Sequence, residues 1–316
     1  MRAWRELHLE SETLALTLLP DKGAEIVSLV DRRTGAELLA RLRPTPPDDG
    51  SLRAEGTDFD RWYAGGWQEL LPNAGDACVV DGVAHAFHGE SWARPWAVRS
   101  ASATEATFAV TLTSAPLRVT KRLRLADDAA RLELEETLEH IGTAPLDVLW
   151  GQHPAFGPPL VGAGARVTVP ACRVTVVAVD GRSRLAPSEG RWPLVPDRRG
   201  APIDISRVSG REARTHDLAL LHDLEDGWYR LERPEADLGV LVTFDATLFT
   251  WLWMWQLYGD ADDEPFRDGY CLALEPFTGP PGLAAARAAG EVLRLEPGER
   301  RSTRFSLEAY RPSAEA

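Results

Sequence analysis

A single histidine lies within the apolar, proline-rich stretch WGQHPAFGPPL at residues 150–160. An imidazole has a pKa of about 6.5 in water, so His153 could give or take a proton near neutral pH. Pro154 directs the residue before it toward an extended backbone, and Trp150 and Phe156 could shield the ring from solvent. A core histidine that hydrogen-bonds a backbone carbonyl is the alternative interpretation. His153 is therefore a candidate acid or base.

A glutamate occupies a comparable position in CLALEPFTGPPG, residues 271–282. Leu272 and Leu274 alternate with Ala273 and Glu275, which predicts a strand that carries the carboxylate at its end, where Pro276 stops regular pairing. An apolar neighbourhood raises the pKa of a carboxyl group and makes it a useful base near neutral pH. Glu275 is the second candidate, and a strand-end carboxylate that faces water is the alternative.

The remaining histidines do not predict a metal site. His85 and His88 are three residues apart, so on a strand they point to opposite faces, although the nearby Glu90 would complete a possible ligand set. His216 and His222 are five residues apart and form a poorer pair. We therefore expect no metal site at these histidines.

The segment TWLWMWQLYG, residues 250–259, predicts a strand with two different faces. Trp251, Trp253 and Trp255 fall on one face, and the residues between them, including Gln256, fall on the other. One face must pack in the core. The other offers either an aromatic platform or an amide to a ligand, so Trp253 and Gln256 are candidate binding residues, with core packing as the alternative.

The elements that position these residues are predicted to be strands. Period-two alternation of apolar and polar residues occurs in several segments separated by turn signals: 107–113, 131–139, 166–179, 238–245 and 304–310. Helical periodicity does not extend over ten residues anywhere, and the Ala-rich 283–290 is short. We expect an all-β fold of large antiparallel sheets with few short helices, in one domain that spans residues 1–316.

Composition restricts the class of partner. The chain has 316 residues and a formal net charge of −13, which disfavours binding to nucleic acid or to anionic lipid surfaces. It has no apolar run long enough to span a membrane and no secretory signal layout, so we expect a cytoplasmic protein. Cys78, Cys172 and Cys271 lie far apart, which indicates free thiols.

Six motifs together resemble the aldose 1-epimerase (galactose mutarotase-like) superfamily. They occur in the order seen in that superfamily, over residues 14–310: LPDKGAEIVSLVDRRTGAELL, LLPNAGD, HGESW, WGQHPAFG, LALEPFTGPPG and LRLEPGERRS. The resemblance implies a β-supersandwich with a sugar cleft on a concave sheet face. It implies an isomerase that interconverts the α and β anomers of a hexose without a cofactor, acting on a small sugar as a monomer or homodimer.

The resemblance also implies roles for individual residues. Glu275 and His153 match the catalytic glutamate and histidine, and His88 matches a histidine that contacts the substrate. The superfamily's substrate-binding arginine is replaced here by GGWQELLPNAG, residues 65–75, in which Gln68 and Asn73 are the candidate contacts. Its sugar-binding aspartate could be Asp217, Asp223 or Asp245.

Two other functions compete with mutarotation of a free hexose. Arg94 follows the HG motif closely, as in hexose-6-phosphate 1-epimerases, and an arginine there could bind a phosphate in bidentate fashion. A non-catalytic carbohydrate-binding protein of the same fold is the other alternative, although a mere binder has no need of an acid and a base together.

Overall fold

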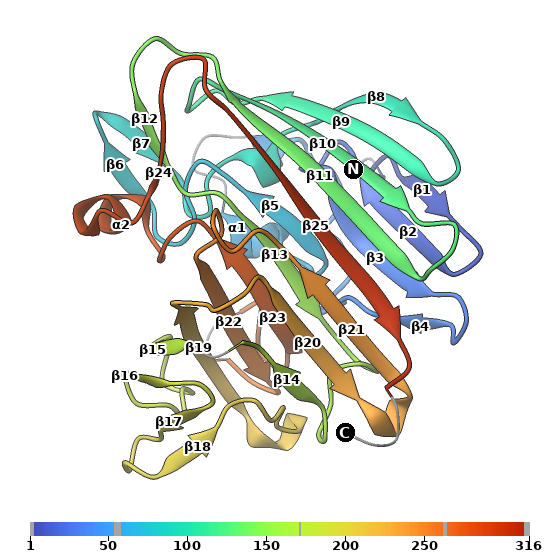
Figure 1. The fold of residues 1–316 in the computed structure, drawn as a ribbon, viewed down its shortest axis with the longest axis vertical. Coiled ribbons are helices and arrows are strands. Elements are labelled where there is room, and N and C mark those ends of the chain that lie inside the picture. Colours follow the sequence, from blue (N-terminus) through green and yellow to red (C-terminus); the bar gives the residue numbers. More distant parts are fainter. Residues whose placement is uncertain (1–2, 54–57, 171, 262–263, 313–316) are drawn as a thin grey trace.

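A computed structural model of the chain describes residues 3–53, 58–170, 172–261 and 264–312, and its strands form two large antiparallel sheets (Figure 1). The larger sheet has 13 strands. In spatial order they are β1 (Leu7–Glu10), β2 (Leu14–Leu19), β3 (Glu25–Asp31), β5 (Trp67–Leu70), β13 (Gly151–Phe156), β23 (Tyr270–Phe277), β22 (Trp251–Tyr258), β19 (Thr215–His222), β15 (Arg173–Val177), β16 (Ser188–Arg191), β17 (Leu194–Pro196) and β18 (Pro202–Asp204), with β4 (Ala36–Glu37) paired to β3.

The smaller sheet has eight strands. Their spatial order is β14 (Arg166–Thr168), β20 (Trp228–Arg233), β21 (Leu238–Thr243), β25 (Arg300–Tyr310), β11 (Arg131–His140), β10 (Leu117–Leu125), β9 (Glu105–Thr111) and β8 (Ala97–Ala101).

Short elements complete the described fold. Two small two-stranded sheets pair β6 (Cys78–Val80) with β7 (Val83–His85) and β12 (Leu146–Val148) with β24 (Leu293–Leu295). The α-helices are α1 (Phe59–Trp62) and α2 (Leu283–Ala289), and 3-10 turns occur at Ser51–Arg53, Ser91–Ala93, Arg211–Ala213 and Pro234–Ala236. No described helix has the length and apolar character needed to span a membrane.

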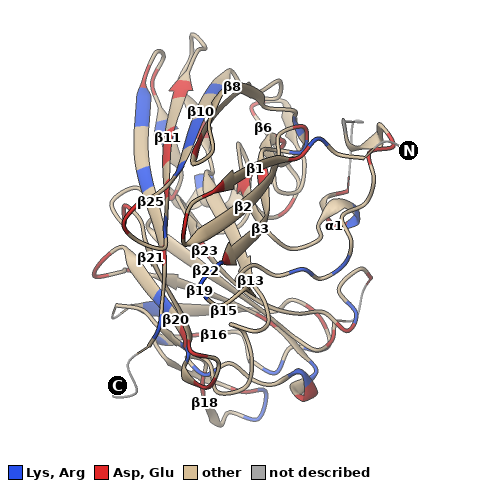
Figure 2. Ribbon diagram, turned by 90° about the vertical axis from the view of Figure 1, so that its right-hand side faces the viewer, with Lys and Arg blue, Asp and Glu red and all other residues tan. Residues whose placement is uncertain are grey.

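The main core lies between the two large sheets. Figure 2 shows β11 and β25 on one side and β1 to β3 on the other. One cluster of buried apolar side chains includes residues from Leu9 to Ala309. In β11 the residues alternate strictly, with Leu132 and Leu134 buried and Glu133 and Glu135 on the outer side. Burial of this alternating apolar face from both sheets is the dominant stabilising contribution to such a sandwich.

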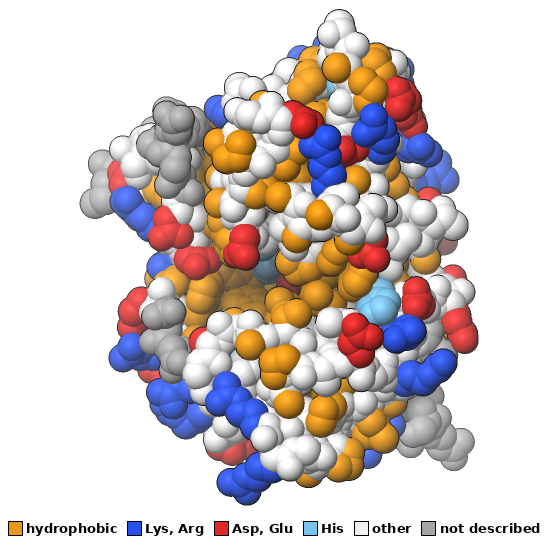
Figure 3. Space-filling view, turned by 90° about the vertical axis from the view of Figure 1, so that its left-hand side faces the viewer, with side chains coloured by type: hydrophobic (Ala, Val, Ile, Leu, Met, Phe, Trp, Pro, Cys, Tyr) orange, Lys and Arg blue, Asp and Glu red, His pale blue; other side chains and the backbone are white. Residues whose placement is uncertain are grey.

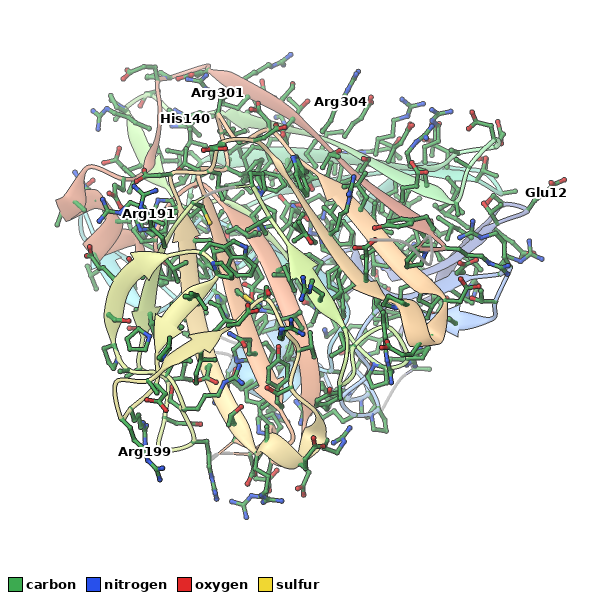
Figure 4. All side chains as sticks on the ribbon, turned by 60° about the horizontal axis from the view of Figure 1, so that its bottom comes forward. Glu12, His140, Arg191, Arg199, Arg301 and Arg304 are labelled. Carbon is green, nitrogen blue, oxygen red and sulfur yellow. The ribbon has the colours of Figure 1, made fainter. Side chains whose placement is uncertain are left out.

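The outer face of the smaller sheet carries cross-strand ion pairs. Arg118 of β10 and Arg300 of β25 both contact Glu139 of β11, at 3.0 Å and 2.9 Å. Arg304, which projects from β25 near Arg301 in Figure 4, contacts Glu135 at 3.1 Å. Charged side chains on this face keep it solvated, and exposed pairs of this kind contribute little to stability.

Most predicted strands are confirmed with small shifts in their ends. Segments 107–113, 131–139, 238–245 and 304–310 correspond to β9, β11, β21 and β25, and the Ala-rich segment forms α2. The segment 166–179 is the exception, because it forms two strands in different sheets. β14 pairs with β20 in the smaller sheet, whereas β15 pairs with β19 in the larger one.

A buried polar network links the two sheets. Lys121 of β10 contacts Glu69 of β5 at 2.7 Å and Glu136 of β11 at 3.4 Å. Trp150 Nε1 donates to Glu69 at 3.0 Å, and Gln152 Nε2 donates to Glu136 at 2.9 Å. Burial and the neighbouring Glu69 carboxylate raise the pKa of Glu136 well above its usual range. The network ties the smaller sheet to β5 and to β13.

We expect Lys121→Met to lower the free energy of unfolding by about 3–5 kcal/mol, because it leaves the buried side chains of Glu69 and Glu136 without their cation. Arg118→Met is the matched control on the exposed face of the same strand and should cost about 0–1 kcal/mol. Urea unfolding measures both. Equal effects of the two substitutions would contradict the structural role of the network.

Candidate functional site

His153 and Glu275 face one another across β13 and β23. These strands pair at Gly151↔Phe277 and again at Ala155↔Ala273, and the same register places His153 opposite Glu275. Side chains of directly opposed residues lie on the same face of a sheet. The sequence predicted both residues as candidates, and the register brings them together although 121 residues separate them in the chain (positions 154 to 274).

The ladder between β13 and β23 is interrupted where these two residues lie. Pro154 and Pro276 occupy the stretch between the two paired positions, and neither has an N–H to donate. Gly151 is the first residue of β13. Glycine fits there because a Cβ at this position would lie 1.9 Å from the Phe277 ring. The proline-containing segment therefore places His153 where the ladder between β13 and β23 of the larger sheet is interrupted.

A cleft with a volume of about 680 Å³ opens over this face of the larger sheet. His153, Glu275 and His88 line it, with aromatic walls from Phe59, Tyr63, Trp253, Trp255 and Phe266. Figure 3 shows an apolar hollow with acidic side chains gathered near its edge. The cleft is of the size and character typical of small-molecule sites.

His153 and Glu275 form a buried pair. His153 Nε2 lies 3.5 Å from Glu275 Oε2, and the two residues are 5% and 2% exposed. Burial raises the pKa of Glu275 well above its usual value and lowers the pKa of His153 to about 4. The carboxyl group therefore binds the first proton of the pair, and His153 is neutral at pH 7.

His88 adds a hydrogen-bond donor to the site. The backbone N–H of Gly75 donates to His88 Nδ1 at 3.0 Å, so in the neutral ring the hydrogen is on Nε2. Burial, with a smaller effect of His153, lowers the pKa of His88 well below 6.5 and keeps the ring neutral. Its ring centroid is 5.9 Å from that of His153. A neutral donor thus lies beside the buried pair.

Asn73 holds the loop that carries His88. Its Nδ2 donates to the carbonyls of Asp76 and Ala86, both at 2.9 Å, and its Oδ1 accepts from the Leu283 N–H at 2.9 Å. Asn73 is fully buried and is not among the residues that line the cleft. All of these hydrogen bonds are made to the backbone, so in this structure Asn73 holds the loop and does not line the cleft.

Three other predicted contacts are also absent from the lining of the cleft, although Gln68 is the cross-strand partner of His153 on β5. Gln68 is buried and donates to the Gly65 carbonyl at 2.7 Å. Arg94 donates to Glu90 at 2.6 Å and to Thr113. Gln256 accepts from Arg184 Nη2 at 2.8 Å, on the core side of β22. None of the three is among the residues that line the cleft, so the structure does not place them beside His153 and Glu275 as cleft residues.

The tryptophan strand behaves as its alternation predicted. Trp253 and Trp255 line the cleft, whereas Leu252 and Met254 belong to the core between the sheets. Trp253 is 3% exposed, donates to the Gly279 carbonyl at 3.1 Å and stacks on Phe277. One of its faces is therefore already covered.

Several lining residues were missed from the sequence. His216 and Asp180 line the cleft together, with His216 Nδ1 2.6 Å from Asp180 Oδ2. Tyr63, which follows α1, lines it with a buried hydroxyl that has no hydrogen-bond partner among the described residues. Leu218, two residues after His216 on β19, also lines the cleft, but no sequence signal places Asp180 or Tyr63 beside His216.

The cleft has an acidic character. Its described lining includes Asp60, Asp76, Asp180 and Glu275 and includes no lysine or arginine. The aspartate candidates from the sequence do not line it, and Asp217 is fully buried, where it accepts from Ser183 and Arg184, each at 3.0 Å. Within the described residues, no three His, Cys, Asp or Glu side chains converge as a metal site would require.

Comparison with known families decides where the chain belongs. Residues 2–309 match the family described as a domain of unknown function, DUF4432. The chain is a member of this family. A comparison with curated protein sequences found no significant match.

Solved structures share the fold of this DUF4432 protein. Slr1438 from Synechocystis sp. PCC 6803 is 17% identical, with a TM-score of 0.71 over 99% of this chain and 97% of that one. The galactose mutarotase related enzyme from Lactobacillus acidophilus is 15% identical, with a TM-score of 0.67 over 99% of each chain. A galactose mutarotase-like protein from Lactobacillus casei ATCC 334 is 19% identical, with a TM-score of 0.62 over 97% and 100%. The predicted galactose mutarotase-like fold is confirmed.

The burial of His153 in this DUF4432 protein leads to a prediction about the pH at which its ring is protonated. Because burial lowers its pKa to about 4, the ring should remain neutral as the pH falls from 7 to 5 and should bind a proton only near pH 4. NMR titration of the histidine ring signals measures this, with His153→Gln used to assign the signal. Titration of His153 near its usual pKa of 6.5 would contradict the buried geometry.

Proposed function

We propose that the protein is an aldose 1-epimerase that interconverts the anomers of a neutral sugar, with Glu275 and His153 as the catalytic residues. The observation that carries the proposal is the buried contact of 3.5 Å between these two groups in the cleft of a galactose mutarotase-like fold. Anomer interconversion needs one group to take the proton of the C1 hydroxyl and another to protonate the ring oxygen. A carboxylate and an imidazolium provide both.

In ring opening, the Glu275 carboxylate takes the C1 hydroxyl proton and His153 Nε2 gives its proton to the ring oxygen. The bond between C1 and the ring oxygen breaks as the C1 carbonyl forms, so the proton count of the pair is unchanged. After rotation about the C1–C2 bond, the steps run in reverse on the other face of the carbonyl, and the pair returns to its initial state.

The proton must move within the pair before this step. In the ligand-free cleft burial favours the uncharged forms, so the carboxyl group holds the proton. Sugar hydroxyls that donate to the carboxylate stabilise its charged form and shift the proton to His153. His88 Nε2–H is a fixed donor that can orient an oxygen near the anomeric centre.

The acidic cleft favours a neutral sugar over a hexose 6-phosphate. A phosphate would meet Asp60, Asp76 and Asp180 with no described cationic side chain in the lining, and Arg94 is already paired with Glu90 away from the cleft. Like-charge contact of this kind disfavours binding.

We therefore expect faster turnover of D-glucose or D-galactose than of D-glucose 6-phosphate, measured by polarimetry on freshly dissolved anomers at equal concentration. A preference for the phosphorylated sugar would contradict this assignment. Saturable binding of either sugar without faster mutarotation would instead support a non-catalytic carbohydrate-binding protein.

Glu275→Gln and His153→Ala should each lower the rate of mutarotation by about 10²- to 10⁴-fold, because each removes one of the two proton-transfer groups. Glu12→Gln is a matched control, since Glu12 is exposed, projects outward in Figure 4 and does not line the cleft. His8→Ala controls for loss of an imidazole on β1. If a folded Glu275 or His153 variant retained the full rate, the assignment would be wrong.

A further inference from the structure

Trp255 is the aromatic side chain of the cleft whose surroundings suggest a role of its own. It is half-buried, unlike the fully covered Trp253 two residues earlier. Its ring centroid lies 6.2 Å from that of His153, so it forms the wall beside the buried pair. Its cleft side is therefore available to a ligand that reaches Glu275 and His153.

The indole of Trp255 begins a chain of hydrogen bonds. Trp255 Nε1 donates to His216 Nε2 at 2.6 Å, and His216 Nδ1 lies 2.6 Å from Asp180 Oδ2. Asp180 also accepts from the Arg182 backbone N–H at 2.7 Å through its other oxygen. Trp255, His216 and Asp180 all line the cleft.

The indole N–H determines which atoms donate and which accept in this series of hydrogen bonds. An indole nitrogen only donates, so His216 Nε2 must accept and carry no hydrogen, and the hydrogen of the neutral ring is on Nδ1, where it is donated to Asp180. Both nitrogens of His216 are therefore occupied. His216 is not arranged to exchange protons with a substrate, and its geometry serves to hold Trp255.

Ring contacts hold the indole from other sides. Tyr63 meets it edge-on at 5.9 Å and Phe266 at 5.4 Å. Leu218 is its cross-strand partner on β19. With the hydrogen bond at Nε1, these contacts leave the ring plane little freedom. A fixed aromatic surface next to an acid–base pair can set the position of a ligand before reaction.

We propose that Trp255 is the surface on which the apolar C–H face of the sugar ring stacks, and that His216 and Asp180 are positioning residues that fix its plane. This inference rests on the proposed function for the identity of the ligand. The ring oxygen and C1 of a sugar on this surface would face the neighbouring His153 and Glu275. The proposal moves the aromatic contact from Trp253, as the sequence suggested, to Trp255.

The same two strands contain a matched control. His222 of β19 stacks on Trp251 of β22, with ring centroids 4.5 Å apart, and neither residue lines the cleft. This pair repeats the histidine–tryptophan combination outside the site. Substitutions there test whether any effect comes from the strands in general.

The test measures kcat and KM for D-galactose and D-glucose in His216→Ala, His216→Gln and His222→Ala. His216→Ala should raise KM by about two- to tenfold, the range expected for loss of an aromatic contact, with kcat changed by less than about twofold. His216→Gln should stay near the wild-type KM, because the glutamine amide can accept from the indole N–H and donate to Asp180. His222→Ala should leave KM unchanged.

A fluorescence measurement tests the platform without catalysis. Saturating D-galactose should change the tryptophan fluorescence of the wild type and of Trp251→Phe, and this change should be lost in Trp255→Phe. Thermal unfolding of each variant shows whether it is folded.

The outcomes separate this proposal from the proposed function. A sugar-dependent signal that persists in Trp255→Phe, or a KM in His216→Ala equal to that of the wild type, would overturn the platform even if the enzyme is active. A large loss of kcat in His216→Gln would show that His216 exchanges protons and would also overturn it. A wild type that binds sugar through Trp255 but does not speed mutarotation would refute the proposed function alone.

Discussion

The register of β13 against β23 is the constraint on which the site depends. It places His153 opposite Glu275 in a stretch where Pro154 and Pro276 prevent regular pairing. A shift of one residue would send one of the two side chains into the core between the sheets. The chemistry therefore depends on a strand alignment that is set by contacts along the whole of both strands.

Burial of the pair gives it properties that neither group has in water. Desolvation raises the pKa of Glu275 and lowers that of His153, so Glu275 holds the first proton of the pair and both groups are uncharged. The polar network around Lys121 accepts hydrogen bonds from Trp150 and Gln152, which shortly precede His153 in the chain. The stability of the sandwich and the geometry of the site thus depend on the same strand.

The sequence predicted those features of the fold and the site that depend on neighbouring residues in the chain. Alternation predicted the main strands, and apolar, proline-rich flanks marked His153 and Glu275 as candidates. It gave no sign of the partners of Gln68 and Gln256, which are the Gly65 carbonyl and the Arg184 side chain. The contact between His216 and Asp180 joins a strand to a loop 36 residues away, which local patterns do not reveal.

The most direct measurement of the central claim is exchange between the α and β anomers of D-galactose, followed by saturation transfer in the proton NMR spectrum. With the wild-type protein at pH 6, saturation of one anomeric signal should reduce the other, with an exchange rate that rises in proportion to protein concentration. An exchange rate equal to that of the sugar alone, from protein shown to be folded, would contradict the account.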